Sequence, residues 1–278
     1  MKIDSHHHLW QYSSTEYGWI DDSMPVLKAN FLNEELQSQL KANDIQGSVV
    51  VQARQSMEET RWLCEIAQSS NVIKGVVGWI DLLSDNLEQE LLTLKTQTKL
   101  KGFRHVLQGE NDADFMANPK FIHGLTLLEK HDFSYDLLIF ANQLPAAINM
   151  LSQVPNLRVV IDHIAKPDIK TTTGFKQWQQ GMAQLAENPN VYCKISGLVT
   201  EADWDNWQPE DFTPYLNSVM TLFGPHRVMF GSDWPVCLLA ATYAEVKSIT
   251  QTGIETLSQS DQDNVFGHNA VRFYQLDL

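Results

Sequence analysis

The residues most able to do chemistry form a histidine run near the start of the chain. His6, His7 and His8 follow a short apolar stretch and are flanked by an Asp-Ser pair and a Leu-Trp pair. On a β-strand alternate side chains share a face, so we expect His6 and His8 to point one way and His7 the other. Two imidazoles on one face form half of a metal site or of an acid–base site. The alternatives are a remnant of a purification tag, which the short run and its flanks disfavour, or a solvated tip.

Two later residues complete this set. His163 and Asp233 each stand where an apolar, β-branched run ends. Taken alone, His163 is typical of a semi-buried histidine with satisfied hydrogen bonds, and Asp233 of a helix cap. Together with His6 and His8 they supply three imidazoles and one carboxylate, a set that suits Zn²⁺ or a similar cation.

Eight such apolar runs predict the strands that position these residues. Near-continuous β-branched sequence is typical of parallel strands that are buried on both faces. The runs cover residues 2–5, 47–53, 74–81, 101–106, 133–139, 158–163, 191–196 and 227–233. Apolar residues at helical spacing predict helices over 33–43, 57–69, 86–94, 119–130, 143–151, 175–187, 209–223 and 243–250.

The alternation of strand and helix favours one fold class. Eight units over 278 residues average about 35 residues each, the size expected of an α/β chain folded as a (β/α)₈ TIM barrel. We therefore expect a single domain over 1–278, since two smaller domains would need a boundary that the sequence does not show. A last helix over 259–278 should pack Phe266, Val271 and Phe273 against the barrel. Active sites of such barrels lie at the carboxyl ends of the strands.

The composition excludes several classes of partner. A net charge of −14 disfavours nucleic acid and anionic membranes. No apolar run approaches the roughly 20 residues that span a bilayer, and no signal-peptide pattern opens the chain, so we expect a cytoplasmic protein with a small-molecule substrate. Cys64, Cys193 and Cys237 form no Cys-x-x-Cys pair and are expected to be free thiols. The sequence leaves a monomer and a homo-oligomer both open.

Five strings spread over nearly the whole chain resemble the amidohydrolase superfamily. They are DSHHHLW (4–10), KGFRH (101–105), IDHIAKP (161–167), KISGL (194–198) and FGSDWP (230–235). They are similar to the branch of TIM-barrel hydrolases that includes sugar-acid lactonases and the pyrone-dicarboxylate lactonase. This resemblance implies a hydrolase that opens the lactone ring of a sugar acid in carbohydrate metabolism.

The sequence departs from the metal-rich members of that superfamily at the fifth strand. Those members place a histidine or a modified lysine there, whereas this chain offers only Tyr135 and Asp136. A two-metal centre is therefore not expected. The resemblance implies one divalent ion, with zinc favoured, or none, because a lactone is an activated ester. The expected ligands are His6, His8, His163 and Asp233.

The expected mechanism uses Asp233 as the general base on a water molecule that attacks the lactone carbonyl, after which Asp233 returns the proton to the ring oxygen. His163 is the second expected catalytic residue. The three imidazoles either donate to the developing oxyanion or hold an ion that polarises the carbonyl.

Candidate substrate contacts come from the same strand ends. The polar candidates are Gln52, Arg104, His105 and Lys194, and Trp10 and Trp79 are candidate pocket walls. The alternative is structural, with Arg104 and Lys194 paired to Asp136 or Asp81 and the tryptophans packed in the core.

Two other functions remain open from sequence. One is a metal-dependent decarboxylase of an aromatic or unsaturated acid, which chelator sensitivity and CO₂ release would identify and which the missing fifth-strand histidine disfavours. The other is a non-catalytic barrel that binds a sugar acid, which the complete set of site residues disfavours.

Overall fold

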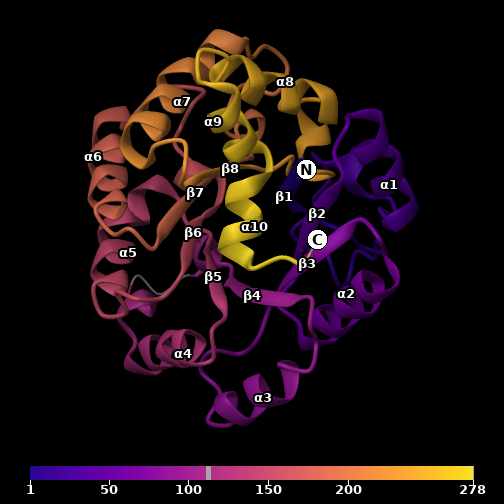
Figure 1. The fold of residues 1–278 in the computed structure, drawn as a ribbon, viewed down its shortest axis with the longest axis vertical. Helices are drawn as coiled ribbons and strands as arrows, with labels where there is room; N and C mark the ends of the chain where they lie inside the picture. The colour runs from indigo at the N-terminus through magenta and orange to yellow at the C-terminus, as the bar shows by residue number, and fades with distance from the viewer. Residues whose placement is uncertain (111–113, 278) are drawn as a thin grey trace.

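A computed structural model describes residues 1–110 and 114–277. Eight parallel strands lie side by side in chain order (Figure 1), which confirms the predicted barrel. They are β1 (Ile3–His7), β2 (Gly47–Val51), β3 (Ile73–Gly78), β4 (Leu100–His105), β5 (Ser134–Leu137), β6 (Val159–Ile161), β7 (Val191–Ile195) and β8 (Val228–Phe230). The ring closes beyond β8, where His7 pairs with Trp234 and the His8 amide donates a 2.7 Å hydrogen bond to the Trp234 carbonyl.

Helices connect the strands and cover the outside of the barrel (Figure 1). They are α1 (Asn33–Ala42), α2 (Met57–Ser69), α3 (Leu87–Leu94), α4 (Pro119–Lys130), α5 (Leu144–Leu151), α6 (Phe175–Ala186), α7 (Pro209–Phe223) and α8 (Tyr243–Gly253). Their starts follow the capping rules: the Ser56 hydroxyl accepts from two amides of α2, and Asn118 precedes Pro119 and accepts from the Lys120 amide.

Seven of the eight strands end one to three residues earlier than the sequence pattern predicts, and for two of them the reason lies at the site. The sixth run was expected to reach 163 and the eighth 233, but β6 ends at Ile161 and β8 at Phe230. His163 and Asp233 have φ values of 52° and 56°. This left-handed backbone cannot continue a strand, and hydropathy carries no signal for it.

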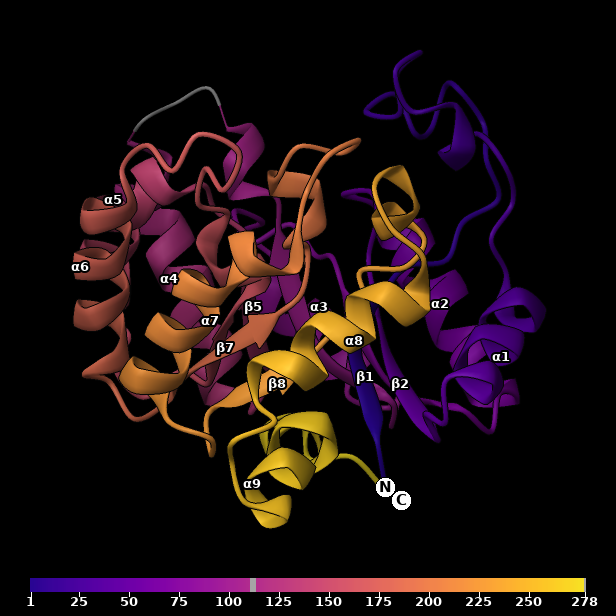
Figure 2. The same cartoon turned by 90° about the horizontal axis from the view of Figure 1, so that it is seen from above.

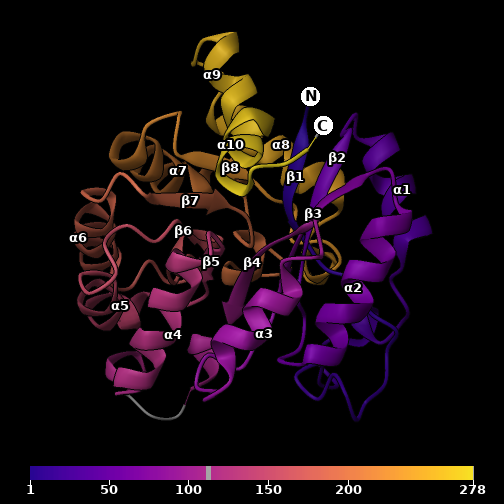
Figure 3. The ribbon, with the colours of Figure 1, turned by 60° about the horizontal axis from the view of Figure 1, so that its bottom comes forward.

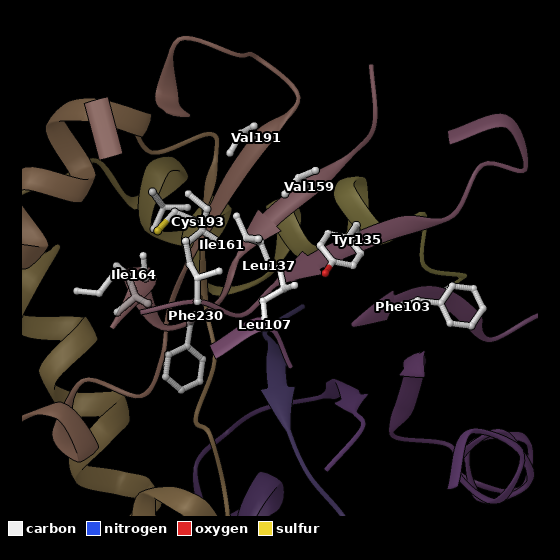
Figure 4. Close-up of a cluster of buried hydrophobic side chains, with 14 of the residues drawn as sticks. Phe103, Leu107, Tyr135, Leu137, Val159, Ile161, Ile164, Val191, Cys193 and Phe230 are labelled. Carbon is white, nitrogen blue, oxygen red and sulfur yellow. The ribbon is translucent and has the colours of Figure 1, made fainter. Parts of the chain in front are cut away.

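A large apolar cluster fills the space between the strands and the surrounding helices. Figure 4 shows part of it, with side chains from β5, β6 and β7 such as Leu137, Ile161 and Cys193. Apolar burial of this extent is the main stabilising contribution to such a barrel. Cys64, Cys193 and Cys237 are buried free thiols, as expected.

The carboxyl-terminal segment covers the amino ends of the strands, beside both termini and opposite the long loops (Figures 2 and 3). The single helix predicted over 259–278 is instead α9 (Gln259–Asp263), a π-helical turn (Asn264–His268) and α10 (Asn269–Tyr274). The chain leaves the helix at Gln275, whose φ is 51°, and Leu278 lies outside the described residues. Phe266 and Phe273 are buried as predicted, and Phe273 packs with Ile3 and Val49 at the foot of the barrel. No helix within the described ranges is long and apolar enough to cross a membrane.

Candidate active site

A cavity of about 630 Å³ opens where the strands end. His8, Arg104, His163 and Asp233 line it, and each of these side chains is almost fully buried. They follow or end β1, β4, β6 and β8, so the barrel brings together residues that are up to 225 positions apart in the chain. The volume lies in the ordinary range for small-molecule sites.

The strand geometry of β1 separates the three histidines as predicted. His6 Nε2 and His8 Nε2 lie 3.3 Å apart on the side of the site. His7 points to the other face, where its Nε2 lies 3.0 Å from the Ser48 hydroxyl. His7 therefore packs in the structure and takes no part in the site.

Hydrogen bonding fixes the tautomer of His8. Its Nδ1 lies 2.8 Å from the Val51 carbonyl oxygen, which only accepts, so Nδ1 carries the proton. His8 Nε2 is then an unprotonated nitrogen, and it faces Asp233 Oδ1 at 3.3 Å. In the neutral ring this nitrogen accepts a proton or binds a cation.

His163 and Asp233 are held by their left-handed backbone. The Asp233 amide donates to the His6 carbonyl at 2.8 Å, and His163 Nδ1 lies 2.9 Å from the Ser196 hydroxyl. Gly197 makes room for the imidazole, because a Cβ at this position would lie 2.5 Å from His163 Nδ1. His163 Nε2 then faces Asp233 Oδ1 at 3.9 Å.

Burial and neighbouring charges set the ionisation of the site. Burial raises the pKa of the Asp233 carboxyl, but His163 and the contact with His8 outweigh it and the net pKa is lowered. Burial lowers the pKa of His163 to about 4 and that of His6 well below its usual value. At neutral pH the Asp233 carboxylate is therefore ionised, and His6 and His163 are neutral.

The donor atoms of His6, His163 and Asp233 lie close enough together to hold one divalent ion, and His8 Nε2 lies beside Asp233. In a tetrahedral zinc site with bonds of about 2.1 Å, ligand atoms lie roughly 3.4 Å from one another. Asp233 Oδ1 lies 3.3 Å from His8 Nε2, 3.8 Å from His6 Nε2 and 3.9 Å from His163 Nε2. The other nitrogen of each imidazole also faces a group that can accept its proton: the Val51 carbonyl for His8, Asp162 Oδ1 at 3.2 Å for His6 and the Ser196 hydroxyl for His163.

A second cluster of potential ligands is already occupied by a lysine. His6, Asp136 and Asp162 converge beneath the site. The ammonium of Lys194 lies among them, 2.5 Å from Asp136 Oδ2, 3.0 Å from Asp162 Oδ1 and 3.1 Å from His6 Nδ1. The Lys194 ammonium thus occupies the place where a second metal would need to bind.

Of the six predicted substrate contacts, one lines the cavity and the other five do not. Arg104 lines the cavity, where its Nη1 lies 3.3 Å from His6 Nε2 and 3.0 Å from Asp162 Oδ2. Gln52 is fully buried and accepts from Arg104 Nη2 at 3.1 Å, while Lys194 lies in the buried cluster. Both support the floor from below rather than line the cavity.

The three aromatic candidates also lie outside the residues that line this cavity. His105 contacts Glu110 at 2.6 Å and stacks on Phe115. Trp10 is fully buried and donates to the Ala29 carbonyl, and the backbone of Trp79 is held by Thr60. Direct contact of these three side chains with a substrate stays a prediction.

Several cavity residues were missed by sequence reasoning. Arg54, Lys166, Glu201 and Trp204 line the cavity from the loops after β2, β6 and β7. Lys166 lies within the IDHIAKP string and Arg54 directly follows the second apolar run, so the sequence pattern could have marked both. Glu201 and Trp204 have no spacing or pattern that marks them.

The chain is similar to known proteins over nearly its whole length. The model of the family described as Amidohydrolase matches residues 3–276. An L-fucono-1,5-lactonase of Burkholderia multivorans is 38% identical, with 99% of this chain and 96% of that protein covered. An L-fucono-1,5-lactonase of Burkholderia ambifaria is 34% identical, with the same coverage. A crystal structure of a Burkholderia multivorans amidohydrolase with bound zinc superimposes with a TM-score of 0.96 at 38% identity and covers 100% of both chains.

Proposed function

The chain belongs to the amidohydrolase family, and from that premise we propose that it hydrolyses the ring ester of a sugar-acid lactone in carbohydrate catabolism. The relatives named as L-fucono-1,5-lactonases support a lactone as the target rather than the carboxyl group of an aromatic acid. One observation carries the proposal: the ionised Asp233 carboxylate lines the cavity and faces His8 at 3.3 Å and His163 at 3.9 Å. A cytoplasmic location stays a prediction.

In this mechanism Asp233 is the general base. It accepts a proton from water while the water oxygen bonds to the lactone carbonyl carbon. The bond between that carbon and the ring oxygen then breaks, and Asp233 returns the proton to the ring oxygen to give an open hydroxy acid. The lowered pKa of Asp233 keeps the base ionised at neutral pH. His163, next to Asp233, orients the carboxylate.

Negative charge develops on the carbonyl oxygen during the attack and needs a positive partner. Arg104 supplies a permanent one, since its guanidinium lies on the cavity floor beside His6. Two acceptors of Gln52 and the Asp162 carboxylate fix the guanidinium in place. The guanidinium therefore does not need to move when negative charge develops on the carbonyl oxygen.

We further propose that His6, His8, His163 and Asp233 hold one divalent ion, zinc. When bound, such an ion polarises a carbonyl and lowers the pKa of water. Equilibrium dialysis with metal analysis should find one zinc per chain. His8→Ala should lose it, whereas His7→Ala should not, because His7 faces Ser48. Equal zinc binding by both variants would contradict this ligand set.

The test of the function is hydrolysis of a panel of aldonolactones, followed by the acid released, with and without chelator. Asp233→Asn should lower kcat by ~10²–10⁴-fold with an unchanged fold. Asp81→Asn is the matched control, since Asp81 is an exposed carboxylate that also follows a strand. A panel without any lactone turnover, or a fully active Asp233→Asn variant, would overturn the proposal.

A further inference from the structure

An ion pair on the cavity wall takes no part in the mechanism above. Lys166 Nζ lies 3.2 Å from Glu201 Oε1, and both residues line the cavity. Their side chains are 17% and 18% exposed, so both groups are largely shielded but still reach the space that a substrate would fill. They come from two different loops, after β6 and after β7.

An unusual backbone ties this pair to the catalytic centre. The four residues from His163 to Lys166 have φ values of 52°, 49°, 60° and 46°. Consecutive left-handed residues are costly for L-amino acids, above all for β-branched Ile164, and persist where the surrounding structure holds them. The Lys166 amide closes the turn on the His163 carbonyl at 2.8 Å, and Trp178 donates to the Ile164 carbonyl.

This turn brings two polar side chains to one cavity. His163 and Lys166 both line it, while Ile164 and Ala165 between them are buried in the core. The position of Lys166 is therefore set by the same segment that sets His163. A group placed in this way is suited to orient a substrate against the catalytic centre.

The charges of the cavity indicate what kind of substrate it accepts. Among the described residues that line it, each arginine or lysine already contacts a carboxylate: Arg54 with Glu16 at 2.6 Å, Arg104 with Asp162 at 3.0 Å and Lys166 with Glu201 at 3.2 Å. A carboxylate on the substrate would meet one of these carboxylates beside each cation, so repulsion would offset its attraction to the cation. Hydroxyl groups instead bind without breaking the Lys166–Glu201 pair, because the ammonium has further donors and the carboxylate has further acceptor sites.

An aromatic residue stands beside this pair. Trp204 lines the same cavity, and its indole nitrogen donates to the Thr200 carbonyl at 2.9 Å. That hydrogen bond fixes the ring plane. A fixed aromatic face suits the C–H side of a polyhydroxylated ring.

We propose that Lys166 and Glu201 bind two adjacent ring hydroxyls of a neutral, polyhydroxylated lactone, with Lys166 donating to one hydroxyl oxygen and Glu201 accepting from the other hydroxyl. The proposal rests on the lactonase function above and adds its substrate class. Lactones that carry an additional carboxylate on the ring are excluded as good substrates.

The experiment compares a six-carbon aldono-1,5-lactone with its 2-deoxy, 3-deoxy and 4-deoxy analogues. On the parent lactone, Lys166→Met and Glu201→Gln should each lower kcat/KM by about 10–100-fold, the usual range for a lost hydrogen bond to a charged group. On the analogue that lacks the contacted hydroxyl, the variant and the unaltered protein should have the same kcat/KM. A loss of equal size on all four lactones, or no loss, would overturn the proposal.

The matched controls are Lys170→Met and Asp203→Asn. These residues form an ion pair of 3.3 Å on the same two loops, but they are 59% and 38% exposed and lie outside the cavity lining. Both controls should hydrolyse every lactone as the unaltered protein does. Glu201→Gln keeps the shape of its side chain, so it remains informative if Lys166→Met folds poorly.

A second comparison tests the effect of a negative charge on the substrate. A lactone with a ring carboxylate should have a kcat/KM at least about 100-fold below that of the neutral parent, because the described arginines and lysine that line the cavity are each already paired with a carboxylate. Comparable turnover of the two would refute a neutral substrate class. Failure of the unaltered protein to open any lactone would refute the proposed function instead, so the two failures are distinguishable.

Discussion

The hydroxyl of Tyr274, in the last helix, donates a 2.8 Å hydrogen bond to Asp136 Oδ2 inside the barrel. Asp136 contacts Lys194, and Lys194 Nζ lies 3.1 Å from His6 Nδ1. All four side chains are fully buried. The segment that closes the amino end of the barrel is thus connected to the catalytic end through three consecutive polar contacts.

Tyr274→Phe should lower the free energy of unfolding by about 1.5–3 kcal/mol, because a buried carboxylate loses one of its hydrogen-bond donors. Denaturant unfolding measures this. The control is Tyr192→Phe, since Tyr192 packs on Phe273 at the same end of the barrel with its ring 4.9 Å away. An equal loss in both variants would show that the hydrogen bond to Asp136 contributes nothing of its own.

Lys194→Met should be more damaging, by about 3–5 kcal/mol, because it leaves the Asp136 and Asp162 carboxylates buried without their shared cation. Adding Asp136→Asn to this variant removes one uncompensated charge and should restore part of the stability. A double-mutant cycle on unfolding free energies measures the coupling. Strictly additive losses would contradict the pairing.

Gly197→Ala should separate backbone strain from displacement of His163. The added Cβ would lie 2.5 Å from His163 Nδ1, and Gly197 has a φ of 62°. A displacement of about 1 Å at a catalytic group costs on the order of 100-fold in rate, so we expect kcat to fall by ~10–100-fold. Gly174→Ala is the control, because Gly174 has a φ of 77° but nothing within 4 Å of the added Cβ. It should lose about 1 kcal/mol of stability and keep its kcat. Equal kcat losses in both would exclude a specific effect on His163.

The sequence alone was sufficient to predict the barrel and to group four candidate site residues at one end of it. Buried parallel strands have continuous apolar runs, and the candidate site residues lie at their ends, so pattern analysis could group His6, His8, His163 and Asp233. The helix over Met57–Ser69 and that over Pro209–Phe223 were predicted with the observed bounds.

The cavity walls were not accessible in this way. Glu201 and Trp204 come from a loop whose path depends on tertiary packing, and loop sequence has no periodicity. Lys194 shows the opposite failure. Its position near a strand end suggested a substrate contact, whereas its side chain points into the barrel between two carboxylates. Whether Lys194 reaches the substrate cavity depends on the direction of its side chain on a short, twisted strand. A single sequence does not determine that direction.

A buried carboxylate near Arg54 predicts how stability changes with pH. Glu59 is 1% exposed, and its Oε2 accepts from the amides of Ala53 and Arg54 at 3.0 Å each, which holds the loop that carries Arg54 to the cavity. Burial raises the pKa of Glu59 to about 7, although these two amides oppose the shift. Because the folded pKa exceeds the unfolded one, the proton stabilises the folded state fully below the unfolded pKa, about 4.5, and this contribution is lost as the pH rises through about 7.

Glu59→Gln removes this titration. Relative to the unaltered protein, its free energy of unfolding should increase by about 3 kcal/mol between pH 4.5 and 7.5, an upper value from the size of the pKa shift. Denaturant unfolding at a series of pH values measures the difference. Glu58→Gln is the control, since its carboxylate is in the same helical turn but 83% exposed. A pH dependence of the Glu59→Gln difference no larger than that of Glu58→Gln would mean that Glu59 stays ionised in the folded protein, so that the two backbone donors outweigh its burial.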